Sequence, residues 1–280
     1  MADPEAPDQI DNDAGRGSPS VRISPIPLRA RGFDRTTIPW ISPVTFGAIL
    51  CLWWAATISG MSPFGVPSPV EVFRAAADLV RSGEIWAHLG ASFQRLAMGC
   101  LLGILSGIVL GFAIGISPLV RSAAVPLVSA LFAIPKIAIL PVLIVCLGIG
   151  ELSKIVTIAL GVFSPMVIAT YTGVDNVDRN LIRMGQSFDM PMHHIVAKIL
   201  LPGALPTLVG GLRVAMSIGI VLLTAAEMIG AQSGIGAFIL RAGNLMRTDQ
   251  MFAGIILLAG IGILSSFLLG RTERALLHWR

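Results

Sequence analysis

Residues 96–120 read LAMGCLLGILSGIVLGFAIGISPLV and contain no Asp, Glu, Lys or Arg. An α-helix rises about 1.5 Å per residue, so about 20 such residues cross the hydrocarbon core of a bilayer, which is about 30 Å thick. This stretch is therefore predicted to be a transmembrane helix. Glycine at every fourth position keeps one helix face bare and favours close packing against another helix. These glycines are Gly99, Gly103, Gly107, Gly111 and Gly115.

Further charge-free stretches occur at 36–70, 155–174 and 250–270. Two more apolar stretches carry one charge each, Lys136 within 122–150 and Arg213 within 199–226. Charged residues make up only 13% of the chain, about half the usual share of a soluble domain. We therefore expect an all-α, polytopic membrane protein with six transmembrane helices, at about 41–59, 96–116, 123–149, 155–172, 207–230 and 251–270.

The distribution of basic residues predicts the orientation of these spans. With the N-terminus inside, 12 of the 20 Lys and Arg residues fall in cytoplasmic segments and six in external ones. Both termini are then cytoplasmic, and residues 1–39, which are polar and rich in Pro and Asp, are expected to be a disordered cytoplasmic tail. Residues 40–280 form the transmembrane domain. Topology and membrane lipid account for the net charge of +4, so no nucleic-acid partner is expected.

Two segments outside the spans have an amphipathic pattern. Residues 71–82 are predicted to form a short helix at the outer surface, with Val72, Ala76, Leu79 and Val80 on one side. The cytoplasmic loop 173–206 mixes charged and apolar residues more evenly than a linker does. This pattern is typical of short amphipathic helices that bind a cytoplasmic partner.

The chain lacks the sequence motifs of several enzyme classes. It has no Gly-Lys-Ser or Gly-Lys-Thr, as a phosphate-binding loop requires, and no HExxH zinc motif. We expect no metal site, no cofactor and no enzymatic activity, so any ATP hydrolysis needs a separate polypeptide.

One part of the cytoplasmic loop resembles the signature of binding-protein-dependent ABC transporter permeases. That signature is Glu-Ala-Ala, three residues, Gly, nine residues, then Ile-x-Leu-Pro. Ile199, Leu201 and Pro202 match its end. Arg183 stands where the family has Glu, Gly185 replaces the second Ala, and Asp189 stands where the family has Gly.

Other segments resemble the nitrate, sulfonate, taurine and bicarbonate branch of that family, and the resemblance covers roughly 60–275. They are His88-Leu89 with Ser92 and Arg95, Ile134 to Pro141, Gly148 to Lys154, Gly211-Leu212-Arg213, Ala225 to Met228 and Gly234-Ile235-Gly236.

The resemblance implies a fold and a set of partners. The fold is the type I importer permease fold, located in the bacterial inner membrane. The partners are a second copy of the permease, cytoplasmic ABC ATPase subunits and a periplasmic substrate-binding protein. Carried across to this chain, the ATPase-coupling residues are Arg183, Gly185, Asp189, Met190, Met192, His193 and Pro202.

The function that we expect is ATP-driven import of a small anionic solute, similar to a sulfonate, nitrate or taurine, by alternating access. Pro126, Pro135 and Pro141 interrupt the third span, and such breaks are tolerated beside a water-filled cavity. Ionisable and hydroxyl side chains within spans are the candidates for the translocation pathway. They are Lys136, Ser164, Ser217, Thr224 and Glu227.

Two alternatives remain open at this stage. Glu227 could be a residue in water at the outer end of its span, or could be paired with Arg241. The chain as a whole could be a self-contained secondary transporter or channel, which would need intramembrane charges arranged for ion coupling.

Overall fold

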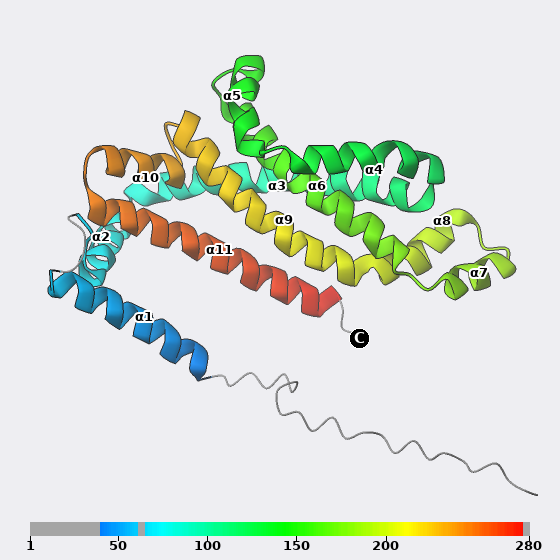
Figure 1. The fold of residues 1–280 in the computed structure, drawn as a ribbon, viewed down its shortest axis with the longest axis horizontal. Coiled ribbons are helices and arrows are strands. Elements are labelled where there is room, and N and C mark those ends of the chain that lie inside the picture. The colour runs from blue at the N-terminus through cyan, green and yellow to red at the C-terminus, as the bar shows by residue number, and fades with distance from the viewer. Residues whose placement is uncertain (1–39, 61–64, 277–280) are drawn as a thin grey trace, which may run out of the picture. The chain divides into compact units, whose positions relative to one another are not determined.

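The structure is a computed structural model that describes residues 40–60 and 65–276. The predicted tail, residues 1–39, lies outside the described residues. Residues 1–47 and 48–280 form two units, and of the first only the start of helix α1 is described. The described elements are all helical (Figure 1): α1 Ile41–Ile58, α2 Pro69–Ser82, α3 Glu84–Ile116, α4 Pro118–Ala133, α5 Lys136–Leu147, α6 Glu151–Asp175, α7 Arg179–Ser187, α8 Met192–Ile195, the π-helical turn η1 Val196–Leu200, α9 Leu201–Gly230, α10 Ile235–Asn244 and α11 Thr248–Leu276.

The helices confirm the predicted all-α architecture with six spans. Five continuous helical segments are long and apolar enough to cross a membrane, and the bent pair α4–α5 makes a sixth if it counts as one span. The predicted interruption of the third span is the 96° bend between α4 and α5.

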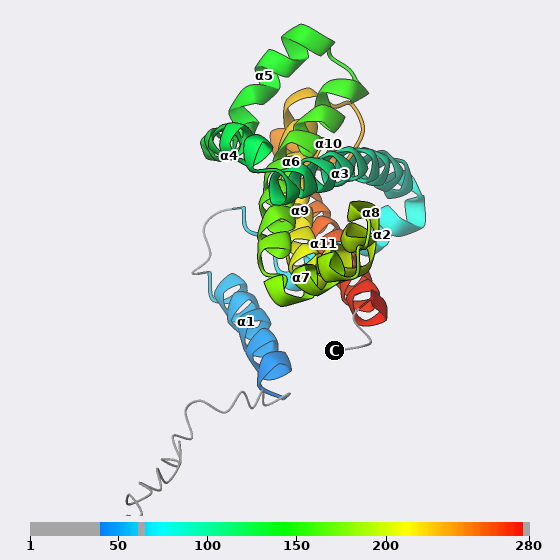
Figure 2. The same cartoon turned by 90° about the vertical axis from the view of Figure 1, so that its right-hand side faces the viewer.

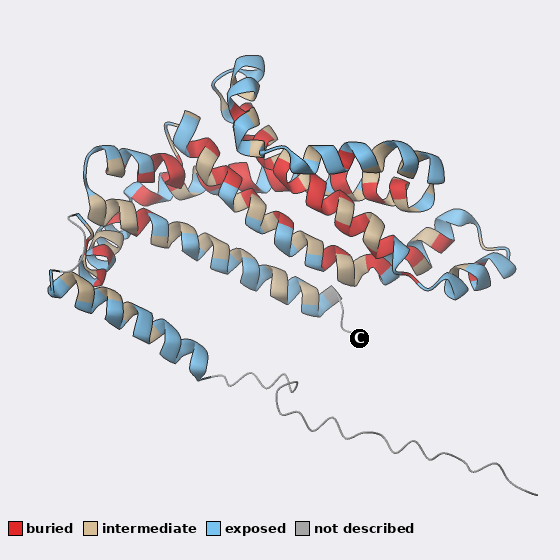
Figure 3. Cartoon of the chain, viewed as in Figure 1, coloured by how far each residue is buried: buried red, intermediate tan, exposed pale blue. Residues whose placement is uncertain are grey.

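Helices α3, α6 and α9 form the core of the fold. Buried residues concentrate on these three helices (Figure 3), and the view in Figure 2 shows α3 crossing beside α6 and α9. The five glycines of the four-residue repeat in α3 all face α6. A Cβ atom at Gly107 would lie 2.7 Å from the Met166 Cβ, and one at Gly103 would lie 2.6 Å from the Ala159 carbonyl oxygen. The glycine repeat is therefore a packing surface for α6, as predicted.

Small residues also set the spacing between α6 and α9. A Cβ at Gly173 would lie 3.1 Å from the Ala204 Cβ, and one at Gly211 would overlap Ala169. Helix packing within lipid has little hydrophobic driving force, so close backbone approach of this kind supplies van der Waals contact instead. Since α6 packs against both α3 and α9, it is the central helix of the core.

Two helices extend beyond their predicted spans. Helix α3 begins at Glu84, 12 residues before the predicted start at residue 96, because His88, Ser92 and Arg95 are buried within the fold rather than exposed beyond it. The helix that ends at Gly230 is continuous from Met192, through η1, although its predicted span began at 207. Arg95 had set the predicted start of the first of these spans, and it lies within the helix.

The predicted short helix 71–82 is confirmed as α2. Its N-terminus is capped reciprocally by Ser68 and Glu71, and the hydrogen bond from the Ser68 backbone N–H lowers the pKa of Glu71. Val72 and Leu79 are buried and belong to a cluster with Phe238 of α10 and Ala253 of α11. The amphipathic side of α2 therefore packs on protein.

The glycine packing predicts a position-dependent effect of one substitution within α3. Gly107→Leu should destabilise the protein by about 1–3 kcal/mol, because the new side chain overpacks the contact with α6. Gly90→Leu, in the same helix, is the matched control, since a Cβ at Gly90 has no atom within 4 Å. Thermal unfolding in detergent measures both, and equal midpoints for the two variants would contradict the assigned contact.

Candidate functional site

The elbow between α4 and α5 places a charge at a break in a transmembrane segment. Ile134 has an extended conformation before Pro135, as a residue preceding proline favours, so the helix stops there. The Lys136 Nζ lies 2.6 Å from the Leu131 carbonyl oxygen and 2.7 Å from that of Phe132. The ammonium thus satisfies carbonyls freed by the break and complements the negative end of α4.

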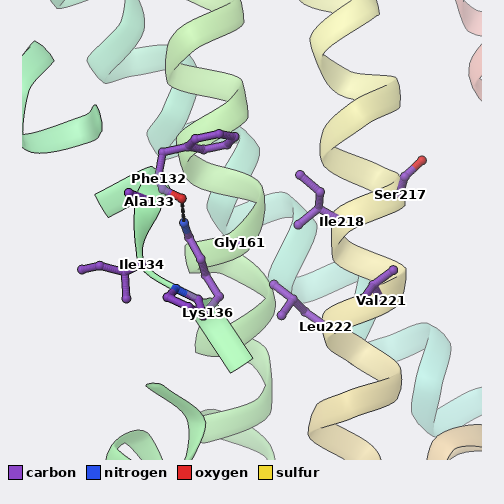
Figure 4. Close-up of a pocket in the computed structure, with 10 residues that line it drawn as sticks. Phe132, Ala133, Ile134, Lys136, Gly161, Ser217, Ile218, Val221 and Leu222 are labelled. Carbon is purple, nitrogen blue, oxygen red and sulfur yellow. Dashed lines mark hydrogen bonds between the residues drawn. The ribbon is translucent and has the colours of Figure 1, made fainter. Parts of the chain in front are cut away.

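This elbow forms one wall of a cavity of about 450 Å³. Figure 4 shows Lys136 and Phe132 on the elbow, facing Ile218 and Leu222 of α9 across Gly161 of α6. Most of the lining is apolar. The polar groups in it are the Lys136 ammonium, which has a third N–H beyond the two bonded to carbonyls, and the Ser217 hydroxyl. The cavity can therefore hold a mainly apolar molecule with a small anionic group.

A second polar site lies where α3, α6, α9 and α10 meet. We call it the polar cluster, and it consists of His88, Ser92, Arg95, Glu151, Lys154 and Glu227. Arg95 is its centre. The Arg95 Nη1 lies 2.8 Å from Glu227 Oε1, and its Nε and Nη2 both bond to the Glu151 carboxylate. The two carboxylates differ in environment, because the Glu227 side chain is fully buried whereas that of Glu151 is 60% exposed.

The polar cluster also caps helix α10. The backbone N–H groups of Gly234, Ile235 and Gly236 donate to His88 Nδ1 at 3.0 Å, to Ser92 Oγ at 2.8 Å and to Glu227 Oε2 at 2.9 Å. The first turn of a helix has N–H groups without partners in the helix, and a carboxylate is favoured there. Side chains of α3 and α9 thus fix where α10 begins.

Gly234 is required by the same contact. Its φ is +122°, and a Cβ atom there would overlap the Glu227 carboxylate and lie 2.6 Å from Arg95 Nη1. The turn between α9 and α10 can therefore approach the ion pair only with glycine at this position. The Arg95 Nη1 also donates to the Ser233 carbonyl oxygen at 2.6 Å.

The structure separates the candidate pathway residues into different environments. Lys136 and Ser217 line the elbow cavity together, whereas Glu227 belongs to the polar cluster. Glu227 is paired with Arg95, and Arg241 donates instead to the Gln232 carbonyl oxygen. Thr224 donates to the Ile220 carbonyl oxygen of its own helix. Ser164 is buried on α6, and its hydroxyl has no hydrogen-bond partner among the described residues.

Sequence reasoning did not identify Arg95, Glu151 and His88 as parts of one site. The sequence did carry one signal for this site: His88, Ser92 and Arg95 are spaced at i, i+4 and i+7 and therefore share one helix face. Glu151 and Glu227 carry no comparable signal, since their separation along the chain hides the contact. Within residues 40–60 and 65–276, the polar cluster included, no three His, Cys, Asp or Glu side chains are grouped to hold a metal ion.

The loop 173–206 contains the end of α6, the short helix α7 and the start, from Met192, of the long helix that includes α9. Asp178 caps the N-terminus of α7. Gly185 is buried, and a Cβ atom added there would lie 3.0 Å from Ile199 Cδ1. Asp189 has a φ of +50°, in the left-handed region. Asp is one of the few residues other than glycine that adopt this conformation readily. The turn therefore accommodates Asp where the resembling family has Gly.

The side chains of this loop face in different directions. Met190 is half-buried and packs on the core cluster, and Pro202 lies in the first turn of α9. Arg183 and His193 are exposed, and the His193 ring lies 4.4 Å from that of His194. The large apolar side chains that are exposed here are Leu181, Met184, Phe188, Met192 and Leu201, with Phe188 the most exposed at 75%.

Comparison with known proteins now adds to this geometry. Residues 103–278 match the family model described as "Binding-protein-dependent transport system inner membrane component". The chain belongs to this family. It is thus a transport permease component, of the ABC importer type, in a multi-pass inner-membrane location.

Curated relatives and solved structures agree with that assignment. The chain is 34% identical over 241 residues to the taurine transport system permease protein of Escherichia coli (strain K12), covering 84% of this chain and 88% of the relative. It is equally identical over 244 residues to a putative aliphatic sulfonates transport permease protein of Bacillus subtilis (strain 168), covering 86% and 88%. An inward-facing structure of the MetNI methionine ABC transporter has the same permease fold, with a TM-score of 0.60 at 23% identity over 69% of this chain and 98% of that one.

The unequal burial of the two carboxylates predicts unequal effects of removing them. Glu227→Ala should destabilise the protein by about 3–5 kcal/mol, because it removes the carboxylate partner of the buried Arg95 guanidinium, of the Ser92 hydroxyl and of the Gly236 N–H. Glu151→Ala should cost about 1 kcal/mol or less, since this carboxylate is largely exposed to solvent. Thermal unfolding in detergent compares them, and equal losses would contradict the assigned roles.

The conformation of Asp189 predicts how the turn after α7 responds to substitution. Asp189→Gly should leave it intact, whereas Asp189→Val should destabilise it by about 1–2 kcal/mol, because a β-branched residue is strained at this φ. The rate of limited proteolysis within 179–195 reports local opening of the turn. Faster cleavage of the Gly variant than of the Val variant would contradict this reading.

Proposed function

We propose that this permease is the membrane subunit of an ATP-driven importer that moves a small sulfonate-like anion into the cytoplasm by alternating access. Two observations support the solute class. The relatives at 34% identity are named for taurine and aliphatic sulfonates. The elbow cavity presents one ammonium, from Lys136, within an apolar lining. A sulfonate head group paired with a small organic body matches those two features.

The end of the bundle that carries α7 is the cytoplasmic end in this proposal. Arg179, Arg183 and Lys198 lie there, as expected for a cytoplasmic loop in the inner membrane. Both chain termini are then cytoplasmic. The α10 turn and the polar cluster lie at the opposite ends of the same helices, so they face the periplasm, where a substrate-binding protein would deliver the solute.

The exposed apolar face of the loop is the observation that carries the proposal. Met184, Phe188 and Met192 are all more than half exposed, although they lie outside the candidate spans or at the end of one. Apolar residues clustered on a polar segment mark a protein contact. We propose that they enter a groove of an ABC ATPase subunit together with His193, while Gly185, Asp189, Met190 and Pro202 shape the loop and Arg183 frames it.

A second copy of the permease would complete the membrane part. Helix α9 exposes Val214, Ser217 and Val221 along one stripe, beside the elbow cavity and a neighbouring apolar cavity of about 480 Å³. A pathway between two copies would be lined by this stripe and by Lys136. Thr224 and Ser164 lie on the helices that flank it, and Glu227 would act in gating by holding the α10 turn.

The docking surface leads to a direct test of ATPase coupling. Phe188→Asp should abolish solute-stimulated ATP hydrolysis by the reconstituted complex of permease, ATPase and binding protein, because it places a charge in an apolar contact. Phe73→Asp is the matched control, since Phe73 is an equally large, exposed residue on α2 at the other end of the bundle. Taurine is the solute probe.

Both variants should insert into the membrane and unfold at the wild-type temperature, since neither phenylalanine is buried. Full stimulation by taurine in the Phe188→Asp complex would contradict the assigned docking surface.

A further inference from the structure

The cationic side chains within the helices differ in how many of their donors are used. Arg95 bonds through Nε, Nη1 and Nη2 to two carboxylates and to Ser233. Arg213 on α9 makes one hydrogen bond, from Nη2 to Glu273 Oε2 on α11 at 2.7 Å. A guanidinium has five N–H donors. Within the described residues, four donors of Arg213 therefore remain without a protein acceptor.

Arg213 faces an open crevice between α9 and α11. The crevice has a volume of about 250 Å³. Its polar lining consists of Arg213 and the hydroxyls of Ser217, Ser265 and Ser266. Ser265 and Ser266 have no hydrogen-bond partner among the described residues. A guanidinium fork beside free hydroxyl donors is a suitable environment for an oxyanion.

The ion pair in the crevice lies at the surface of the chain. The side chain of Arg213 is 58% exposed and that of Glu273 is 38% exposed. Glu273 lies 25 residues after the start of α11, about 38 Å along the helix, which exceeds the thickness of the hydrocarbon core. The ion pair thus sits near the α7 end of the bundle, at the membrane boundary.

The crevice also adjoins the elbow cavity. Ser217 lines both, so the two spaces meet at one residue of α9. An anion that leaves the ammonium of Lys136 would pass Ser217, whose hydroxyl donates to the Arg213 carbonyl oxygen, before it reaches the guanidinium of Arg213. This order runs toward the end of the bundle where α7 lies.

We propose that the crevice between α9 and α11 is an oxyanion-binding site, in which Arg213 binds the anion and Glu273 competes with it. This inference rests on the proposed function for its role in transport, where the site receives the sulfonate group on the inner side. The resident carboxylate keeps binding weak, which lets an anion both enter and leave. A lipid phosphate has the same chemistry as a sulfonate group, so it is the second source of ligand to be distinguished.

Two variants distinguish anion binding by Arg213 from a purely structural role of the Arg213–Glu273 ion pair between α9 and α11. Arg213→Gln removes the anion-binding group, whereas Glu273→Gln breaks the same ion pair and leaves the guanidinium free. A structural tie predicts equal effects of both changes. An anion site predicts opposite effects, with Glu273→Gln binding the anion about twofold to fivefold more tightly, the range that an exposed ion pair supports.

The test measures thermal unfolding of the full chain in detergent with increasing sodium sulfate, against sodium chloride at equal ionic strength. Sulfate stabilises proteins in general, so the differences between variants carry the result. We expect the unfolding temperature of wild type to rise with sulfate in a saturable, sulfate-specific way. The same rise should occur at lower sulfate concentration for Glu273→Gln, and Arg213→Gln should show only the general effect of sulfate. Arg241→Gln, a matched change outside the crevice, should behave as wild type.

Lipid is tested in the same assay with phosphatidylglycerol against phosphatidylcholine. If phosphatidylglycerol raises the unfolding temperature through Arg213, but sulfate and methanesulfonate do not, the result supports the site and assigns it to a lipid phosphate. The proposal is overturned if wild type shows no saturable response to any of these anions, if Arg213→Gln responds as wild type, if Arg213→Gln and Glu273→Gln lose the response equally, or if Arg241→Gln loses it.

Taurine uptake by the reconstituted complex distinguishes this inference from the proposed function. If the wild-type complex takes up no taurine, the solute assignment is contradicted, whereas the sulfate-binding result is unaffected. Wild-type uptake with a tenfold or larger loss in Arg213→Gln, and little loss in Glu273→Gln, would place the site on the pathway.

Discussion

Close approach of α3 to α6 is the contact on which the rest of the structure depends. Lipid offers little hydrophobic driving force for helix association, so packing and buried polar bonds must hold the helices together. The glycines of α3 let its backbone reach the side chains of Met166 and Val162. This approach aligns the start of α3 with the starts of α6 and α10. Arg95 can then bridge Glu151 and Glu227, and Ser92 can cap α10.

Each cation within the helices serves a different purpose in this arrangement. Arg95 is saturated by two carboxylates and a carbonyl oxygen, so it fixes helix ends in place. Lys136 satisfies carbonyls at a proline break and keeps one donor toward a cavity. Arg213 uses one donor and faces a crevice. Of these three cations Arg213 has the most unused donors.

The sequence predicted the parts of this fold that depend on local pattern. The glycine repeat, the proline break and the α2 pattern each act within one helix, and each was confirmed. The polar cluster depends on contacts such as Arg95 with Glu227, 132 residues apart, which no single-helix pattern encodes. Charge was also misleading at the helix starts, because Arg95 was assumed to lie beyond its span. Glu227 was expected on the pathway because it is an ionisable residue within a span, and its place in gating stays a proposal.

The central claim is that this permease transports solute only as part of an ATP-driven complex. The direct measurement is uptake of radiolabelled taurine into proteoliposomes that contain the permease, with the ATPase, the binding protein and ATP each omitted in turn. The account predicts uptake with all three present and background uptake when any one is missing. Uptake by the permease alone, driven by a proton or sodium gradient, would contradict the account.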